Sequence, residues 1–457
     1  MQLECGADLA SGLAHYEHAS DFIIYQVGEC MNRRLLVHKD DFVGILLSGV
    51  FILSFLPYVT TVNTKMLLIG PASLIILAVI SLMSAPAKGA ARIIAALRRW
   101  RFLLLAFVVP VLPTMIAALN NMWYALLYTL LMTAVLCAAQ VLLAILSFQK
   151  IAMAFARAGL ICVAIFMAMS LKQILRAAIS ASRFIPASAQ PNAIGFIFAG
   201  FVAAMALTIF IADKNIISKI LYILAILGGA ATIFVASSRA SMLALFLGCT
   251  YAAMIYAAAL FARGHASKRL LISFLAIFIF GITILIVLRI SLLENAVKYI
   301  SDFLQLNSRH RGFGSGFSGR TERWETTLNA LESSGTWLFG SGYRTSGIEL
   351  GFSVDNGYLT LWYESGLIGL LYVVGQMFWL LSFSSRQFLR HSSNDVKTRA
   401  LFLIVLIIIL LVNNFFDRYL FGFGNPFSIL ALFVILMNRE DLIEARRGAR
   451  LSEGNAQ

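Results

Sequence analysis

Three arginines in short polar segments are the first residues of this sequence whose type suggests chemistry. A guanidinium group binds phosphate oxygens well because its planar fork offers paired, charge-assisted hydrogen bonds. An arginine near a membrane helix end can instead extend its charge to the lipid headgroups, so a structural role is also open for each. If the three share one membrane face, they predict a site for a phosphate or pyrophosphate group. They are Arg183 in "SRFIPASAQPNAIG", Arg239 in "VASSRASML" and Arg320 in "SGRTERW".

Asp355 is a carboxylate in a position where either acid–base chemistry or helix capping is possible. In "VDNGYLTLWYESGLIGLL" it stands with Asn356 just before a long apolar run. A carboxylate can accept a proton from an attacking hydroxyl, and it can equally cap the helix that follows and interact with its dipole. Between the last two apolar runs, Asp417 and Arg418 are interpreted as a local ion pair.

Nucleotide and metal chemistry have little support in this sequence. The glycines at 312, 314, 316 and 319 resemble a phosphate-binding loop, but no Gly-Lys-Ser/Thr follows them and no strand precedes them, which argues against a P-loop. We interpret this stretch as a flexible loop. The cysteines are in the N-terminal tail or inside apolar runs, so we expect no disulfide and no metal site.

The composition is that of a membrane protein. The chain has 457 residues, of which 60% are hydrophobic and 13% charged, and its mean hydropathy is +0.85. Runs of roughly 18–25 apolar residues follow one another, and each can cross a bilayer core of about 30 Å as a helix. The runs are continuous rather than alternating, which excludes a transmembrane β-barrel. The sequence therefore predicts an all-α polytopic membrane protein.

About twelve transmembrane helices are predicted, with boundaries good to a few residues. Lys and Arg are concentrated in the segments that face the cytoplasm when the N-terminus is placed there, so both termini are predicted to be cytoplasmic. This orientation puts Arg183, Arg239, Arg320 and Asp355 on the outer face. The predicted spans are 42–59, 66–84, 102–118, 122–147, 151–170, 193–212, 218–236, 240–261, 270–290, 357–381, 400–416 and 419–437.

The spans divide the chain into five predicted parts. The net charge of +14 reflects this topology, and its scatter over many loops argues against a nucleic-acid partner. The first residues lack the pattern of a signal peptide, and "MNRRLLVHKDD" resembles an ordinary start, so Met1 and Met31 are both candidate starts. The parts are a cytoplasmic tail (1–41), transmembrane helices 1–9 (42–290), a large periplasmic loop (291–356), helices 10–12 (357–437) and a second cytoplasmic tail (438–457).

The large loop is predicted to fold over the membrane. Trp324, Leu328 and Leu331 recur at helical spacing, which predicts an amphipathic helix at about 320–333. Together with Trp337 and Phe339 they form more apolar surface than a free loop would expose.

Four segments, taken in order, resemble the O-antigen ligase and polysaccharide polymerase superfamily of membrane glycosyltransferases. Each segment is short, but their order, spacing and common membrane side make the match specific. The resemblance covers about residues 180–381. The segments are "QPNAIG" (190–195), "SSRASML" (237–243), "SGRTERW" with "LFGSGYRT" (318–324 and 338–345) and "VDNGYLTLWYESGLIGLL" (354–371).

The resemblance implies an enzyme with a fold like the helical membrane class of glycosyltransferases. Members transfer a glycan from undecaprenyl pyrophosphate to an acceptor hydroxyl at the periplasmic face of the bacterial inner membrane. The acceptor is a growing glycan in an exopolysaccharide or O-antigen polymerase, and lipid A core in an O-antigen ligase. The resemblance implies no cofactor and no metal. The expected partners are the lipid-linked oligosaccharide, the acceptor, the bilayer, and chain-length regulator and export proteins.

The resemblance also assigns roles to individual residues. Arg239 and Arg320 match arginines of the family motifs, and their charge would stabilise the departing pyrophosphate in place of a divalent cation. Asp355 is the third expected catalytic residue. The expected substrate-binding residues are Arg183, Asn192, Trp324 and Asn356.

Asp355 departs from the family pattern, since ligases commonly carry His-Asn where this chain has Asp355-Asn356. Aspartate can accept a proton, but it cannot also serve as a cation next to pyrophosphate. This difference favours a polymerase over a ligase. We predict that Asp355 caps the following helix and also faces the acceptor.

Two functions of other classes stay open. A lipid-linked glycan transporter or flippase would need charged or helix-breaking residues in mid-span. Pro71 and Pro110 interrupt spans, but we expect no acidic residue in the middle of one. A structural or signalling membrane protein that binds a partner through its outer loop is the other alternative. Unlike these two alternatives, the glycosyltransferase hypothesis requires the outer arginines to lie close together in space.

Overall fold

The computed structural model describes residues 41–58, 67–85, 87–119, 123–179, 191–211, 216–262, 320–390, 394–418 and 424–437. Within these ranges every regular element is a helix, and nine of the described helices are long and apolar enough to cross a membrane. The helical, multi-pass character of the chain is therefore confirmed. These nine are Asp41–Tyr58, Trp100–Leu119, Trp123–Ile145, Phe148–Ala177, Pro191–Ile209, Ile216–Val235, Arg239–Ala259, Gly357–Arg390 and Val396–Phe416.

Three predicted spans are not among these nine. The predicted spans 66–84 and 419–437 correspond to two shorter apolar helices, α3 (Ile69–Met83) and α18 (Pro426–Leu436). The predicted span 270–290 lies outside the described residues. The count of twelve therefore stays a prediction.

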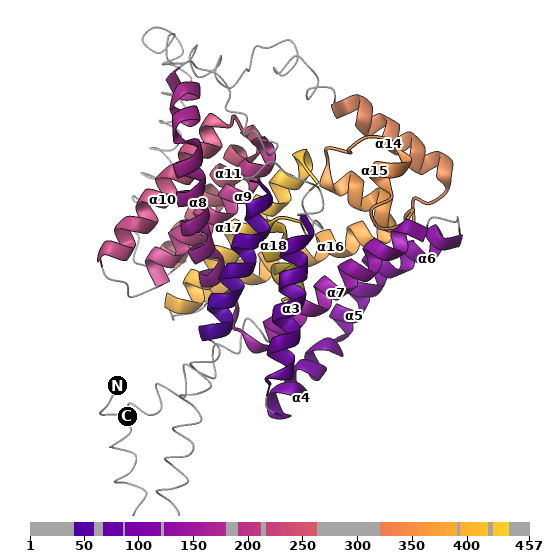
Figure 1. Ribbon diagram of the computed structural model, residues 1–457, viewed down its shortest axis with the longest axis horizontal. Helices are drawn as coiled ribbons and strands as arrows, with labels where there is room; N and C mark the ends of the chain where they lie inside the picture. Colours follow the sequence, from indigo (N-terminus) through magenta and orange to yellow (C-terminus); the bar gives the residue numbers. More distant parts are fainter. Residues whose placement is uncertain are drawn as a thin grey trace, which may run out of the picture.

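The helices pack into two groups that are joined by α18 and by α16 (Gly357–Arg390). α8, α9, α10, α11 and α17 contact one another in one group, and α3, α4, α5, α6 and α7 form the other (Figure 1). α18 contacts both α7 and α9, and all its residues are buried, as expected of a helix that is apolar on every side. The remaining bounds are α4 (Ala87–Leu97), α5 (Trp100–Ala106), η4 (Phe107–Val111), α6 (Leu112–Leu119), α7 (Trp123–Ile145), α8 (Phe148–Ile179), α9 (Pro191–Ile211), α10 (Ile216–Val235), α11 (Arg239–Ala262) and α17 (Asn394–Phe416).

Phenylalanine rings form the centre of the core. Phe155 and Phe201 have ring centroids 4.7 Å apart, and Phe196 and Phe427 have centroids 4.5 Å apart. These contacts join α8, α9 and α18. Because each aromatic pair adds to the area that it buries, this cluster fixes α9, whose first residues lie next to the site described below.

Two stretches differ from their sequence interpretation. Residues 85–101, interpreted as a cytoplasmic loop, contain α4, which buries Ile93 and Ala96 and packs against α7. The span Trp100–Leu119 contains the π-helical turn η4 around Pro110. Proline lacks the N–H of a regular helix, and the hydroxyl of Thr129 donates to the carbonyl oxygen of Pro110 at 3.3 Å.

α16 (Gly357–Arg390) is broken near its start. Gly366 has φ 68° and ψ 176°, a backbone conformation that residues with a side chain rarely adopt. The loop before α15 (Ser346–Glu349) bonds to the break: the amides of Ser341 and Gly342 donate to carbonyls of α16, and the amides of Leu367 and Ile368 donate to carbonyls of the loop. The loop thus satisfies the backbone groups that the break exposes.

The described part of the large loop is folded onto α16. α14 (Arg320–Ser334) confirms the helix predicted at 320–333, and it packs against α16. Its apolar stripe is only partly buried, because Leu331 is buried whereas Leu328 is exposed, as are Trp337 and Phe339 beyond the helix. Residues 291–319 lie outside the described part of the chain.

Candidate functional site

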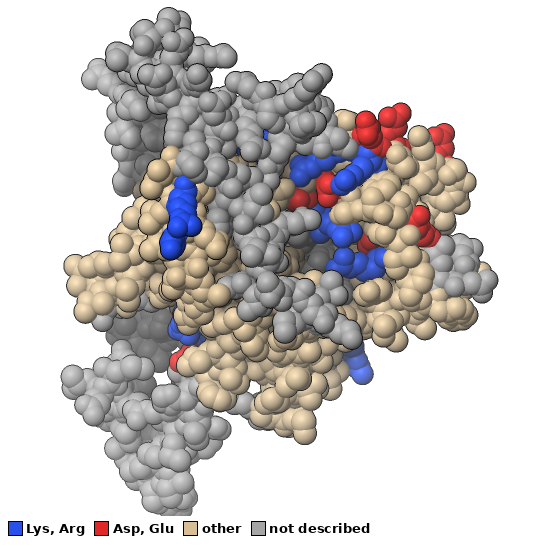
Figure 2. All heavy atoms as spheres, turned by 45° about the horizontal axis from the view of Figure 1, so that its top comes forward, with Lys and Arg blue, Asp and Glu red and all other residues tan. Residues whose placement is uncertain are grey.

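Several helix ends meet at one end of the molecule. α11, α14 and α16 begin there and α17 ends there, and this end, which also carries α15, is called the α14 end below. Figure 2 shows basic and acidic side chains gathered next to each other on the side of α14. Helix ends carry unpaired backbone groups and partial charges, so their convergence favours a polar site.

Arg239 and Arg320 come together at the α14 end. Each is the first residue of its helix, α11 or α14, and the two guanidinium charges are close enough to repel each other. A carboxylate oxygen of Asp417, at the end of α17, lies 3.9 Å from Nη2 of Arg320. The structure therefore places these two arginines at the same end of the molecule, near enough for their charges to interact.

Asp417 was interpreted from the sequence as one half of a local pair with Arg418. The structure shows it as a buried carboxylate, 5% exposed, that faces Arg320. The guanidinium of Arg418 is in electrostatic contact with Glu364 of α16. Each of the two neighbours therefore also contacts a charged residue from a different helix.

Asp355 lies beside a fourth arginine. Nη1 of Arg323 donates to Oδ2 of Asp355 at 2.8 Å, and the hydroxyl of Ser353 donates to Oδ1 at 3.3 Å. The carboxylate side chain keeps 26% of its surface exposed, so it is open to a ligand. Arg323 follows Arg320 by three residues, so the predicted helix already placed both on one face.

Asn356 caps α16, and Asp355 does not. Oδ1 of Asn356 accepts hydrogen bonds from the amides of Tyr358 at 2.9 Å and Leu359 at 3.1 Å, the pattern of a helix N-cap. The prediction that Asp355 caps this helix is therefore wrong, because α16 begins at Gly357 and the cap position directly before it is Asn356. Asn356 is 4% exposed, so its side chain serves the fold.

Asn192 stands in the first turn of α9, next to the turn that carries Arg239. Gly195 of α9 approaches the hydroxyls of Ser238 and Ser241 so closely that a Cβ atom has no room. Ser238 donates to Ser241, which donates to Oδ1 of Asn413 on α17 at 3.0 Å. These contacts explain why glycine and serine occur together in the two motifs: they bring α9, α11 and α17 close behind the arginine.

Trp324 packs within the site. Its ring meets that of Phe415 on α17 edge-on, with centroids 5.6 Å apart, which fixes α14 over the end of α17. Arg183 lies outside the described residues. The structure therefore brings together Arg239, Arg320 and Trp324 and sets Asp355 and Asn356 beside them at the start of α16.

A second charged group, missed in the sequence analysis, lies under the break in α16. Glu364 is 5% exposed, accepts a hydrogen bond from Ser346 of α15, and interacts with Arg344 and Arg418. The sequence analysis expected no acidic residue in the middle of a span, and Glu364 lies in the first third of the predicted span 357–381, before the break. Its signal in the sequence was an acid in "YESG", two residues before a glycine in a long apolar run.

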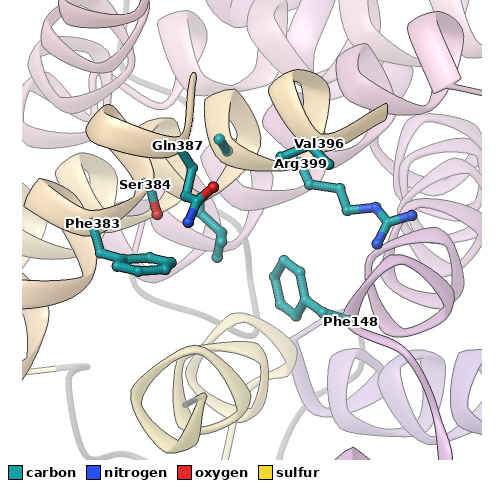
Figure 3. Close-up of a pocket in the computed structure, with 8 residues that line it drawn as sticks. Phe148, Phe383, Ser384, Gln387, Val396 and Arg399 are labelled. Carbon is teal, nitrogen blue, oxygen red and sulfur yellow. The ribbon is translucent and has the colours of Figure 1, made fainter. Parts of the chain in front are cut away.

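Two pockets of the described residues lie away from these arginines. One lies between α8, α16 and α17 near Ser384, Gln387 and Arg399, at the opposite end of α16 (Figure 3). Its enclosed volume of about 20 Å³ holds about one water molecule, which is too small for a sugar. A cavity of about 510 Å³ between α9, α11 and α17 is lined mainly by apolar side chains, with Lys397 and Thr398 at one end. Neither combines carboxylates with arginines.

One family model, described as O-antigen ligase, matches residues 222–374. The matched range contains Arg239, Arg320, Trp324, Asp355 and Asn356, and it does not reach Arg183 or Asn192. A comparison with curated proteins gave no match. Over residues 222–374 the chain thus matches a model of the O-antigen ligase family, which supports the resemblance of the three motifs that lie in this range.

Proposed function

We propose that this protein is a membrane glycosyltransferase that polymerises glycan repeat units at the periplasmic face of the bacterial inner membrane. The donor is an oligosaccharide on undecaprenyl pyrophosphate, and the acceptor is a hydroxyl of the growing glycan. The observation that supports this best is the meeting of Arg239 and Arg320. Two like charges repel, so their proximity favours a site that receives an anion.

In the proposed reaction an acceptor hydroxyl oxygen attacks the anomeric carbon of the donor sugar. The bond from this carbon to the pyrophosphate oxygen breaks, and its electron pair leaves with the polyprenyl pyrophosphate. The hydroxyl proton moves to the carboxylate of Asp355. Arg239 and Arg320 stabilise the charge that develops on the leaving group, which is the task of fixed cationic donors in such a step.

An O-antigen ligase is the second candidate, because the matching family model carries that description. A ligase would use the same arginines and donor and would differ in its acceptor, lipid A core. We favour the polymerase over the ligase because this chain has Asp355 at the position where ligases commonly carry histidine.

The proposed role of the arginines is tested by substitution in the full-length protein. Arg239→Ala and Arg320→Ala should each reduce polymer formation about 100-fold or more, the usual loss when one charged donor is removed. Arg239→Lys and Arg320→Lys keep the charge and lose the fork, so intermediate activity is expected. Arg386→Lys, an exposed position at the other end of α16, is the matched control. Full polymer levels in both Ala variants, at normal amounts in the membrane, would contradict the proposal.

Deletion of the gene separates the two candidate activities. Loss of long chains with single repeat units left on the carrier or on lipid A core would identify a polymerase. Carrier-linked polymer that is intact but absent from lipid A core would identify a ligase. Unchanged envelope glycans would contradict both.

A further inference from the structure

A carboxylate with no assigned role lies close to the arginine site. Glu349 is the last residue of α15, and its Oε2 accepts a hydrogen bond from the hydroxyl of Tyr363 on α16 at 2.8 Å. Tyr124, in the first turn of α7, is in electrostatic contact with Glu349 and Tyr363. Oε1 of Glu349 has no hydrogen-bond partner within the described part of the chain. One oxygen of this carboxylate therefore remains for a ligand.

The surroundings of Glu349 are aromatic and partly open. Partial burial raises the pKa of the Glu349 carboxyl, while the hydrogen bond from Tyr363 acts in the opposite direction. Trp123 directly precedes Tyr124 and is 63% exposed. Trp362 directly precedes Tyr363 and donates its Nε1–H to the carbonyl oxygen of Trp337. Trp337 is itself 48% exposed. Tryptophans thus lie next in sequence to both tyrosines that accompany the Glu349 carboxylate.

Glu349 is one short helix away from the arginines. α15 has four residues and is therefore about 6 Å long. At its start Ser346 bonds to Glu364, and a Cβ atom on Gly347 would lie 3.6 Å from Nη1 of Arg418. Arg418 in turn follows Asp417, which faces Arg320. Glu349 therefore lies one short helix away from the charged group of Glu364 and Arg418 at the α14 end.

We propose that Glu349, Tyr363 and Tyr124 bind a sugar of the acceptor glycan. This inference rests on the proposed function and adds the place where the second substrate binds. A carboxylate accepts hydrogen bonds from sugar hydroxyls, tyrosine hydroxyls both donate and accept, and flat aromatic rings cover the apolar faces of a ligand.

A lipid headgroup suits these residues less well. Tryptophan and tyrosine alone would fit an aromatic belt at the membrane surface. A carboxylate there would face lipid phosphates of the same charge, which is unfavourable. Glu349 distinguishes a lipid headgroup from a sugar as the ligand, because a neutral sugar is not repelled by the carboxylate.

The test measures binding of the acceptor without the donor. The probe is the repeat-unit oligosaccharide released by mild acid from the carrier lipid of cells that express the protein, with the core oligosaccharide of the same cells as a second probe. Binding to the full-length protein in lipid nanodiscs is measured by titration calorimetry. Glu349→Gln should raise the Kd about tenfold or more, the size expected when a hydrogen bond to a charged group is lost. Its amide oxygen still accepts from Tyr363, so the fold is kept. Glu332→Gln, an exposed position on α14, is the matched control and should bind like the wild type.

Kinetics then separate acceptor binding from a merely structural role. In Glu349→Gln the KM for the acceptor should rise while the KM for the donor stays unchanged. The acceptor KM of Glu349→Asp should lie between those of the wild type and Glu349→Gln. Equal acceptor affinity in wild type and Glu349→Gln, or no binding of either probe to the wild type, would overturn the proposal. Acceptor binding that depends on Glu349 without any glycan transfer would instead leave the binding site standing and contradict the proposed function.

Discussion

At the residue scale, the site places arginines beside buried or half-buried carboxylates. Arg320 and Arg323 lie on one face of α14, and they face Asp417 and Asp355 respectively. The carboxylate of Asp417 offsets part of the repulsion between Arg239 and Arg320 in the free protein. An arriving pyrophosphate would meet guanidinium groups that are already held in place, which reduces the cost of ordering them on binding.

Asp355 provides the clearest prediction at this scale. Asp355→Asn should leave stability almost unchanged, because a partly exposed ion pair with Arg323 contributes about 0–1 kcal/mol and Asn356 still caps the helix. Activity should fall roughly 100-fold, since an amide cannot accept the hydroxyl proton. Asp355→His should retain more activity than Asp355→Asn. The measurement is the rate of polymer formation in membranes at matched protein levels.

Asn356→Ala is the structural counterpart. It removes the cap and should lower stability by about 1 kcal/mol, with loss of protein rather than loss of turnover per molecule. If Asp355→Asn builds polymer as fast as the wild type, the proposed role of this carboxylate is wrong.

At the element scale, the break in α16 determines where α15 and Glu364 lie. The amides and carbonyls released by the break bond to residues 337–342, so the loop "LFGSGYRT" and the motif "YESG" form one unit. Gly340, with φ 84°, and Gly366 allow the two backbones to approach closely. A side chain at either position would push the loop away from the helix.

Gly366→Ala tests this arrangement. The φ of Gly366 disfavours any side chain, and a Cβ atom would collide with the carbonyl oxygen of Leu338. We expect a loss of about 3 kcal/mol or more, from backbone strain and steric overlap together, and a fall in activity. Loss of tryptophan fluorescence on heating, at one fixed scan rate, reports the change.

Gly375→Ala in the same helix is the matched control, because nothing lies within 4 Å of the added Cβ atom. Alanine there should be neutral or stabilise by up to about 1 kcal/mol. Equal melting temperatures for the two variants would mean that the loop does not depend on the break.

At the scale of the whole molecule, the polar site and the apolar surface are separate. Many large apolar side chains on α10 and α11 are exposed, as expected for helices that face lipid. A group of acidic and basic side chains gathers at the α14 end, while other charged side chains lie elsewhere on the same view (Figure 2). Under the proposed function, this separation would let a carrier lipid keep its chain in the bilayer while its pyrophosphate reaches the arginines.

Hydrogen exchange tests whether residues 320–345 are a stable part of the molecule. Amides of α14 near the buried residues Thr327 and Leu331, and those of Ser341 and Gly342, should exchange slowly because they are bonded and covered. The amide of Gly335, in the exposed turn after α14, provides the internal reference for fast exchange. Rapid exchange throughout 320–345 in the reconstituted protein would contradict a loop folded over the membrane.

The sequence by itself determined the class of the protein, the approximate place of most spans and the helix at 320–333. These follow from local properties, because apolar length and helical periodicity can be counted along the chain. The same holds for Arg239, Arg320 and Asp355 as candidates, since residue type and position near a span end are also local. The orientation of the spans stays a prediction.

Only the tertiary structure decided which charges meet. Asp417 faces Arg320 rather than only its neighbour, Arg323 pairs with Asp355, and Asn356 takes the capping role. The break at Gly366 and the site of Glu364 also depend on a loop more than twenty residues away in the chain. The physical reason is that electrostatic contacts, and the hydrogen bonds of backbone N–H and C=O groups, depend on distances in space. Sequence spacing does not encode those distances once helices from different parts of the chain pack side by side.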